Sequence, residues 1–600
     1  MPLTQSNQHH TKTLLIWALA MGIGLLLMHN WMLVIENINT KKWLIWPLYA
    51  LIISLPFSMM LLAERPQKLA FQLAVGFSLV AATCASLMGY ASYSPNLETF
   101  YNRENYWIIG FSILVAWFIY ITFAEHFSVH KQWFNHYESL FDFSWRNAVK
   151  LITASIFTVL FWLALTLFAG LFKTININFF SELFENRHFI YPMTALVFGF
   201  GLSLYVTNQK ALSEFKRAIL QVMGYLLPLV SLILCSFIIV MPLNGLHAFW
   251  SRGYDTGLGI MLGLMSLMVF LVNAAFQDGR EVKYPAWLLK LTSIGLIMMP
   301  IYALICAYGL SLRVLDLGWT VKRVWAASWI TLTAIYAFGY ARAAIKSFVI
   351  KSSFGNANVW LQGIKSINIA AAIGILVMLG LLNSPILNPQ RIAVESQVAQ
   401  LLAGKTEANT FNYQYLRFEA GRYGHLALLK LQTNQNADIH AQAKAVLAAK
   451  DYSDVQTLQQ KPLNTPEAFA AKFTVYPTGQ TLSPEFYNFV IKEQKNGALF
   501  FDCLNDLTKK AEKCRALKVD LNNDKVDEVI VLNPYGNRLF AKTGAIWGYV
   551  GDFRIDDYGD NVASDYETAV LESGNYKVIT PDWSELQFGQ QKWRVDKKMR

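Results

Sequence analysis

Residues 367–382 read INIAAAIGILVMLGLL, and NSPILNP follows over residues 383–389. The first stretch is apolar apart from Asn368 and approaches the roughly 20 apolar residues that a helix needs to cross a bilayer. Pro385 and Pro389 then favour an end to the helix. The sequence after residue 384 is polar and mixed and contains no further span. The chain is therefore expected to pass from membrane to water near Leu382.

Ten more apolar segments precede this one, and the first is read as a retained helix and not as a cleaved signal. The eleven predicted spans cover about residues 14–35, 43–62, 70–90, 106–124, 149–171, 190–206, 220–241, 258–276, 289–310, 324–340 and 367–382. The predicted fold is a polytopic α-helical membrane bundle (1–384), a helical membrane-proximal segment (385–464) and a soluble α+β domain (465–600). Residues 344–362 are interpreted as an interfacial helix; if they crossed instead, the tail would change sides.

All of the net positive charge lies in the membrane part. Lys and Arg number 25 against 14 Asp and Glu up to residue 384, whereas the tail has 26 of each. A tail that binds nucleic acid should itself be basic, so no nucleic-acid partner is expected. With a cytoplasmic N-terminus, 16 of the Lys and Arg fall inside and 9 outside, as the positive-inside rule favours. An odd number of spans then puts the tail outside the cytoplasm.

The cysteines are split between the two parts. Cys84, Cys235 and Cys306 fall in predicted spans, where a thiol behaves as a small apolar group. Cys503 and Cys514 are the two in the tail, with ten residues between them. This pair predicts a disulfide in an oxidising compartment, although two buried free thiols would fit a cytoplasmic tail equally well.

Three predicted outer loops carry charged clusters. Their Arg and Lys side chains suit an anionic lipid headgroup, whereas the structural alternative is charge pairing at loop ends. The candidate binding residues are Glu185, Arg187, Arg252, Asp255, Arg313, Asp316, Lys322 and Arg323.

Two further patterns occur in the membrane part. Residues 125–147 interleave aromatic and polar residues, which predicts an amphipathic helix in the inner interface. His126 and His130 in this segment have a spacing that suits a metal, but interfacial histidines are the preferred interpretation. Gly259 and Gly263 have the small-xxx-small spacing of close helix packing.

Three segments resemble a bacterial multi-spanning family known as a domain of unknown function, DUF4153. They are the run from Trp145-Arg146-Asn147 to Phe172, the loop from Asp316 to Arg323, and residues 388–397. The family loop reads roughly Tyr-Gly-Leu-Thr-x-x-Arg, so Asp316 and Trp319 are departures. The resemblance implies a bacterial inner-membrane protein, with a periplasmic tail under the topology above, and it implies no activity.

The tail changes character along its length. Helices are predicted over residues 391–402, 413–431 and 437–449. Short β-rich runs follow at 516–519, 528–532, 538–541 and 545–550, with a turn at 533–537. This order is typical of an α+β domain.

The sharpest motif in the tail is a run of oxygen-bearing residues just before a strand. Side-chain oxygens at positions 1, 3, 5 and 9, with a carbonyl at 7, suit a structural Ca²⁺. Position 6 is Lys525, where an EF-hand has glycine, so the alternative is an acidic hairpin tip. The candidate ligands are Asp520, Asn522, Asp524, Val526 and Glu528.

No Walker loop, nucleophile elbow or zinc-protease motif occurs, so an enzyme is not favoured. The predicted function is a membrane anchor for a periplasmic α+β module with an envelope-related role, in contact with the bilayer and with envelope proteins. The alternative is a transporter, a lipid- or glycolipid-handling protein, or a membrane transferase, with its site on the periplasmic side.

Overall fold

The computed structural model describes residues 5–35, 41–95, 104–207, 209–250, 254–277, 279, 284–349, 360–449, 465–495, 514–532, 537–544, 546–553, 571, 586–588 and 591–593. The chain divides into two compact units, Met1–Tyr452 and Ser453–Arg600. The helices that follow the predicted spans therefore group with the membrane part.

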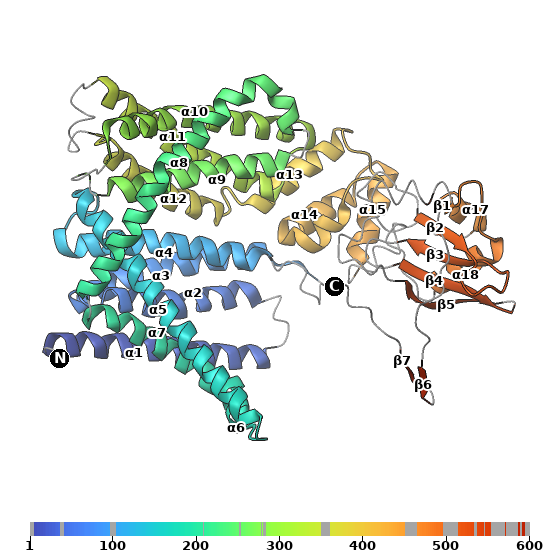
Figure 1. Cartoon of the computed structure of the whole chain (residues 1–600), viewed down its shortest axis with the longest axis horizontal. Coiled ribbons are helices and arrows are strands. Elements are labelled where there is room, and N and C mark those ends of the chain that lie inside the picture. Colours follow the sequence, from blue (N-terminus) through green and yellow to red (C-terminus); the bar gives the residue numbers. More distant parts are fainter. Residues whose placement is uncertain are drawn as a thin grey trace. The chain divides into compact units, whose positions relative to one another are not determined.

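Twelve helices precede Asn383 in the part of the chain that the structure describes (Figure 1). Ten of them contain a segment of 19 to 37 residues that is long and apolar enough to cross a membrane. The predicted sixth span corresponds to α7, which has 21 residues and is not among the ten. The predicted polytopic bundle is confirmed. The helices are α1 (Gln5–Val34), α2 (Lys42–Leu61), α3 (Gln67–Ala91), α4 (Glu104–His130), α5 (Tyr137–Lys173), α6 (Phe179–Glu185), α7 (Arg187–Thr207), α8 (Gln209–Trp250), α9 (Tyr254–Phe276), α10 (Ala286–Leu317), α11 (Val321–Val349) and α12 (Ile364–Leu382).

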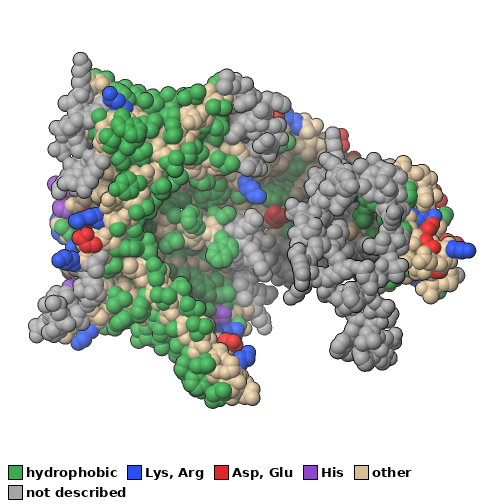
Figure 2. All heavy atoms as spheres, viewed as in Figure 1, with side chains coloured by type: hydrophobic (Ala, Val, Ile, Leu, Met, Phe, Trp, Pro, Cys, Tyr) green, Lys and Arg blue, Asp and Glu red, His purple; other side chains and the backbone are tan. Residues whose placement is uncertain are grey.

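The outside of this bundle is apolar. Figure 2 shows hydrophobic side chains across the face in view, with charged and histidine side chains gathered toward the ends of the helices. Only 11% of the apolar window of α5 and of α12 is buried inside the protein. In water such a surface would be an association liability, whereas lipid tails cover it at no cost. The protein is therefore a multi-pass membrane protein.

The bundle has two hydrophobic cores, which define two lobes. The first lobe comprises α1 to α4 with α7 and the middle of α5, and its core includes Leu62 and Ile121. The second comprises α8 to α12, and its core includes Met265 and Tyr302.

Close helix packing uses other glycines than the predicted pair. A Cβ on Gly199 of α7 would lie 2.5 Å from the Ala18 Cβ of α1, and one on Gly201 would lie 2.8 Å from Ala154 of α5. A Cβ on Gly259 or Gly263 would meet nothing within 4 Å. The small-xxx-small motif therefore does not mediate close packing in this chain.

The bundle has two ends that we name by their contacts. At the entry end, the start of α1 meets the α2–α3 turn, where His10 Nδ1 lies 3.0 Å from the Ala63 carbonyl. The start of α12 meets the start of α5 there, through an ion pair of Lys365 and Glu138 at 2.6 Å. At the exit end, the chain leaves α12 at Leu382, opposite the N-terminus (Figure 1).

The predicted interfacial helix over residues 125–147 is wrong. Here α4 continues to His130, and α5 starts at Tyr137. Lys131 and His136 between them have positive φ angles of 58° and 59°, which a continuous helix does not allow. Of the other predicted interfacial helix, α11 already covers the residues up to Val349, and 350–359 lie outside the described residues.

Three helices and a π-turn complete the first unit: α13 (Pro389–Leu402), η2 (Tyr415–Glu419), α14 (Gly421–Leu431) and α15 (Ala437–Ala448). Asn388 caps α13, and its side chain accepts from the amides of Gln390 and Arg391. The predicted helix over 413–431 is interrupted before Gly421, which has φ +55°.

The second unit contains a five-stranded sheet in the order β1-β2-β3-β4-β5. Strands β1 and β2 are parallel and the other neighbours antiparallel, and α18 packs its Phe486 on Phe540 and Trp547. The predicted β-rich runs correspond to β2 to β5, and the turn residues 533–536 lie outside the described residues. The elements are α17 (Pro466–Ala470), β1 (Phe473–Tyr476), α18 (Pro484–Lys495), β2 (Cys514–Val519), β3 (Glu528–Leu532), β4 (Asn537–Thr543), β5 (Ile546–Phe553) and the separate pair β6 (Leu586–Phe588) and β7 (Gln591–Trp593).

Candidate functional site

The predicted outer-loop residues fall into separate turns. Glu185 and Arg187 flank the α6–α7 turn and are exposed. Arg252 and the side chain of Asp255 lie outside the described residues. The remaining four gather at the α10–α11 turn of the second lobe: Arg313, Asp316, Lys322 and Arg323.

Arg323 hydrogen-bonds to the backbone of this turn. Its Nη1 donates to the carbonyls of Leu317, at 3.2 Å, and Gly318, so it caps the end of α10. Gly318 has φ +70° and ψ −176°, a conformation that is essentially restricted to glycine. The turn is thus built by Gly318 and locked by Arg323.

Helix α13 docks on the same turn. The Trp319 amide donates to Ser396 Oγ at 2.9 Å, and Gln397 Nε2 donates to the carbonyls of Leu317 (2.9 Å) and Trp319 (3.0 Å). A Cβ on Gly318 would lie 2.9 Å from Ser396 Oγ and from Gln400 Nε2. The absence of a side chain at Gly318 therefore lets α13 approach the turn closely.

The next helical turn docks on the first lobe. Arg417 of η2 is 1% exposed; its Nη1 donates to the Pro95 carbonyl at 2.9 Å and its Nη2 to the Ala449 carbonyl at 3.1 Å. Burial lowers the pKa of Arg417. A Cβ on Gly421 would lie 2.5 Å from the Ala91 carbonyl at the end of α3. Residues 388–431, here called the strap, thus contact both lobes at the exit end.

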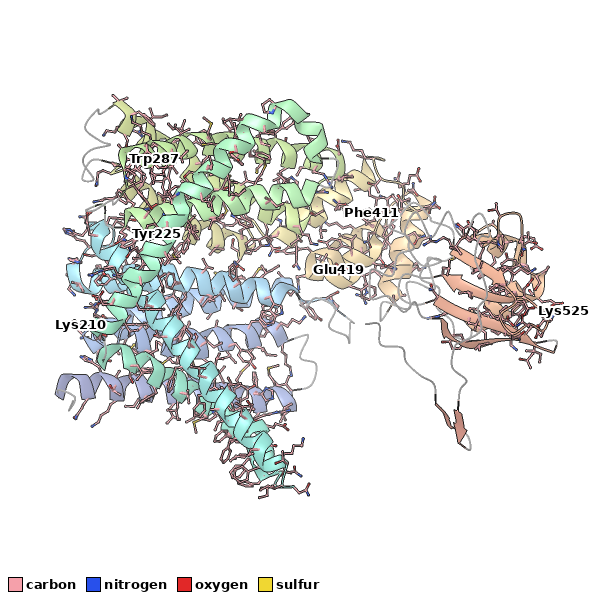
Figure 3. All side chains as sticks on the ribbon, viewed as in Figure 1. Lys210, Tyr225, Trp287, Phe411, Glu419 and Lys525 are labelled. Carbon is pink, nitrogen blue, oxygen red and sulfur yellow. The ribbon has the colours of Figure 1, made fainter. Side chains whose placement is uncertain are left out.

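The strap is also held within itself. Gln390 Nε2 of α13 donates to the carbonyl of Glu419 at 3.4 Å, and Glu419 precedes α14 (Figure 3). The Arg422 guanidinium lies 4.2 Å from the centre of the Tyr90 ring, which adds a cation–π contact to α3. These contacts join the part of the strap that docks on the α10–α11 turn to the part that docks on α3.

A second polar cluster lies at the entry end, and we call it the charge knot. Glu125 is 1% exposed and its carboxylate accepts from Arg65 at 2.8 Å, from Arg146, and from Asn147 Nδ2 at 3.1 Å. Lys150 pairs with Glu64 at 3.2 Å beside it. The knot joins α4, α5 and the α2–α3 turn.

A sequence comparison covers the residues of both the strap contacts and the charge knot. A family model described as domain of unknown function DUF4153 matches residues 14–425. The chain belongs to this family. Two of the segments that carry the resemblance, the α10–α11 turn and the start of α13, contact each other, and the third supplies Arg146 and Asn147 to the charge knot.

The DUF4153 match covers the membrane helices and ends within α14, so the second unit lies beyond it. Comparisons with curated proteins and with solved structures give no match.

The DUF4153 region also contains the paired histidines. The rings of His126 and His130 lie 4.6 Å apart, and His136 joins them at 5.1 Å from His130. Among the described residues, no group of three His, Cys, Asp or Glu is placed to hold a metal. Sequence spacing indicated His126 and His130, whereas His136 is added by the turn between α4 and α5.

The candidate calcium loop, beyond the DUF4153 match, is closed by its own side chains. Asp520 Oδ2 accepts from the Lys525 amide (3.0 Å), Asp524 Oδ1 from Val526 (2.7 Å), and Glu528 Oε2 from Leu521 (2.7 Å). The Asn522 side chain accepts from the Asp524 amide at 2.9 Å. These bonds hold the loop in its turn, and calcium binding stays a prediction.

The predicted disulfide is only partly within the described residues. Cys514 at the start of β2 is buried and disulfide-bonded, whereas Cys503 lies outside the described residues. Cys84, Cys235 and Cys306 are free. The pairing of Cys514 with Cys503 stays a prediction.

Proposed function

We propose that the membrane bundle is a platform that holds the C-terminal α+β unit at the periplasmic face of a bacterial inner membrane, where that unit contacts other envelope components. The observation that supports this best is the strap. In the chain it follows the last predicted span and precedes the second unit, and it docks on both lobes at the end opposite the N-terminus. A strap held at two points fixes where the chain leaves the membrane.

The lipid-handling or transporter alternative has less support. Its candidate outer-loop residues include Arg187 and Arg323, but these two belong to turns of different lobes, and Arg323 caps α10. The strap contacts are hydrogen bonds to backbone carbonyls and to the Ser396 hydroxyl, which suit a structural role better than the binding and release of a ligand.

Reporter fusions test the platform proposal. Alkaline phosphatase fused after Arg600 should be active, and a fluorescent protein that folds only in the cytoplasm should be dark at the same position. The opposite pair of results would place the second unit in the cytoplasm and overturn the proposal. Non-reducing mass spectrometry should also find the Cys503–Cys514 peptide pair, and free thiols at both positions would remove that support.

A structural calcium ion in the 520–528 loop is part of the same proposal, because the periplasm is open to external calcium. Calcium should raise the melting temperature of the full chain in detergent relative to chelator. Asp520→Ala should abolish this increase, while Asp527→Ala, which removes the neighbouring carboxylate that pairs with Lys518, should keep it. An unchanged melting temperature in the parent protein would rule out the ion.

A further inference from the structure

An apolar groove lies between α2 and α4 in the first lobe. Its volume is about 480 Å³, within the range of ligand sites. Ala85 of α3 lines it between the two helices, and Met32 of α1 lines it as well. The other lining residues are Lys42, Ile45, Trp46, Tyr49, Ala50, Ile53, Ser54 and Phe57 on α2, and Ile109, Gly110, Ile113, Leu114 and Trp117 on α4.

At the deep end of the groove, which is the end farther from Lys42, the polar side chains hydrogen-bond to one another. Ser54 Oγ donates to Ser78 Oγ at 2.8 Å, Ser58 Oγ donates to the Ser54 carbonyl at 2.7 Å, and Trp117 Nε1 donates to Ser58 Oγ at 2.9 Å. With these bonds made, the wall offers hydrocarbon and aromatic surface to an occupant. Such a wall suits an alkyl chain and disfavours a polar solute.

The shallow end of the groove is cationic. Lys42 is the first residue of α2 and is 7% exposed, and its N-cap Lys41 makes no side-chain cap. The Lys42 ammonium has three N–H donors and can donate to a lipid phosphate in addition to its interaction within the protein, and the helix dipole is also positive at this end. This end is the exit end, since the Lys42 carbonyl lies against Gly89 near the end of α3.

The groove has the length of one lipid leaflet. From Lys42 to Ser54 an α-helix rises about 18 Å, and half of a bilayer's hydrocarbon core is about 15 Å. An alkyl chain at the deep end would therefore reach the level of Lys42 where its headgroup begins.

We propose that this groove binds one acyl chain of an anionic phospholipid from the exit-side leaflet, with the phosphate of its headgroup against the Lys42 ammonium. This site is distinct from the outer-loop residues and does not depend on the platform function. The phosphate accepts hydrogen bonds from the ammonium, and the chain covers the aromatic and aliphatic wall.

A pair of glycines gives a matched test. A Cβ on Gly110, in the groove, or on Gly76, on α3 away from it, would meet nothing within 4 Å. Leucine therefore fits the backbone at both positions, but only Gly110→Leu fills the groove. Native mass spectrometry of the full chain in detergent, with added phosphatidylglycerol or phosphatidylcholine of the same acyl chains, measures the retained lipid.

The parent protein and Gly76→Leu should retain one phosphatidylglycerol, and Gly110→Leu should bind it about tenfold more weakly, which corresponds to about 1.4 kcal/mol. Lys42→Gln should bind both lipids alike, while Lys41→Gln keeps the preference. Equal retention by the two leucine variants would overturn the groove as the site. An unchanged preference in Lys42→Gln, or none in the parent protein, would overturn the headgroup contact.

A second measurement covers the case in which Gly110→Leu does not fold. Phosphatidylglycerol with a photoreactive group at the end of one acyl chain should label peptides of α2 and α4 in the parent protein. Labelling confined to other helices would overturn the proposal.

Discussion

The two ends of the bundle are joined by different chemistry. At the entry end a buried carboxylate, Glu125, bonds to two guanidinium groups and an amide. At the exit end, Arg417 and Gln397 donate mainly to backbone carbonyls. The helices at the entry end are therefore joined by ion pairs between side chains, and those at the exit end by hydrogen bonds from side chains to backbone carbonyls.

This difference matters for how each end tolerates change. A buried ion pair that loses one member leaves an unpaired charge, which costs several kcal/mol. A lost donor to a carbonyl leaves a neutral acceptor, which costs less. We therefore expect the entry end to be the more sensitive to single substitutions, and the exit end to be the one where the strap can detach locally.

The largest effect is expected from Glu125→Gln. It leaves Arg65 and Arg146 facing each other without their shared anion, so the free energy of unfolding should fall by about 3–5 kcal/mol. The thermal midpoint in detergent measures this. Glu395→Gln, which breaks an exposed pair with Arg391, is the control and should leave the midpoint unchanged. Similar midpoints for the two variants would show that loss of the Glu125 carboxylate does not destabilise the charge knot.

Arg417→Met should have the next largest effect, about 2–3 kcal/mol, because hydrogen bonds from a charged group to the Pro95 and Ala449 carbonyls are lost. A protease should then cleave the strap at a temperature below the one at which the membrane helices unfold. Arg417→Lys keeps the charge but loses the planar guanidinium group, so it should be less stable than the parent protein and more stable than Arg417→Met. A loss as large as that of Glu125→Gln would contradict the contrast between the ends.

Gly318→Ala should cost about 1–3 kcal/mol through its backbone conformation, with additional cost where the new methyl meets Ser396 and Gln400. Gly404→Ala is the control for a positive φ without a steric contact, since Gly404 also has φ +70° but a Cβ there meets nothing within 4 Å. Gly318→Ala should lower the thermal midpoint further, because of its ψ of −176° and its contact with α13. Equal midpoints for the two variants would show that neither contributes.

Hydropathy predicted the spans because length and apolar content are local properties. The β-rich runs were found for a similar reason: Val529, Ile530 and Val531 form a compact apolar run, and the structure buries all three in β3. Both kinds of element can be recognised without knowing their neighbours.

The docking contacts were out of reach because they depend on distant residues. Arg417 and Pro95 are 322 positions apart, and nothing local marks an arginine in a helical segment as buried. The predicted interfacial helix failed for a related reason, since the positive φ of His136 leaves no trace in composition. The resemblance segments marked the α10–α11 turn and residues 388–397, but not that they contact each other.

The smallest predicted effect concerns acid. Burial raises the pKa of Glu64, but Lys150, Arg146 and Arg65 lower it more, so its pKa in the folded protein lies below the ordinary value of 4.5. The unfolded chain therefore binds this proton more readily than the folded protein does, and the stability from Glu64 is present above pH 4.5 and lost as the pH falls through the folded pKa. Glu64→Gln should flatten the decline of the thermal midpoint as the pH falls below 4.5. The Glu395→Gln control should follow the parent protein, because its carboxylate is exposed. A Glu64→Gln profile parallel to the parent would mean that the acid sensitivity of the entry end comes from other groups of the charge knot.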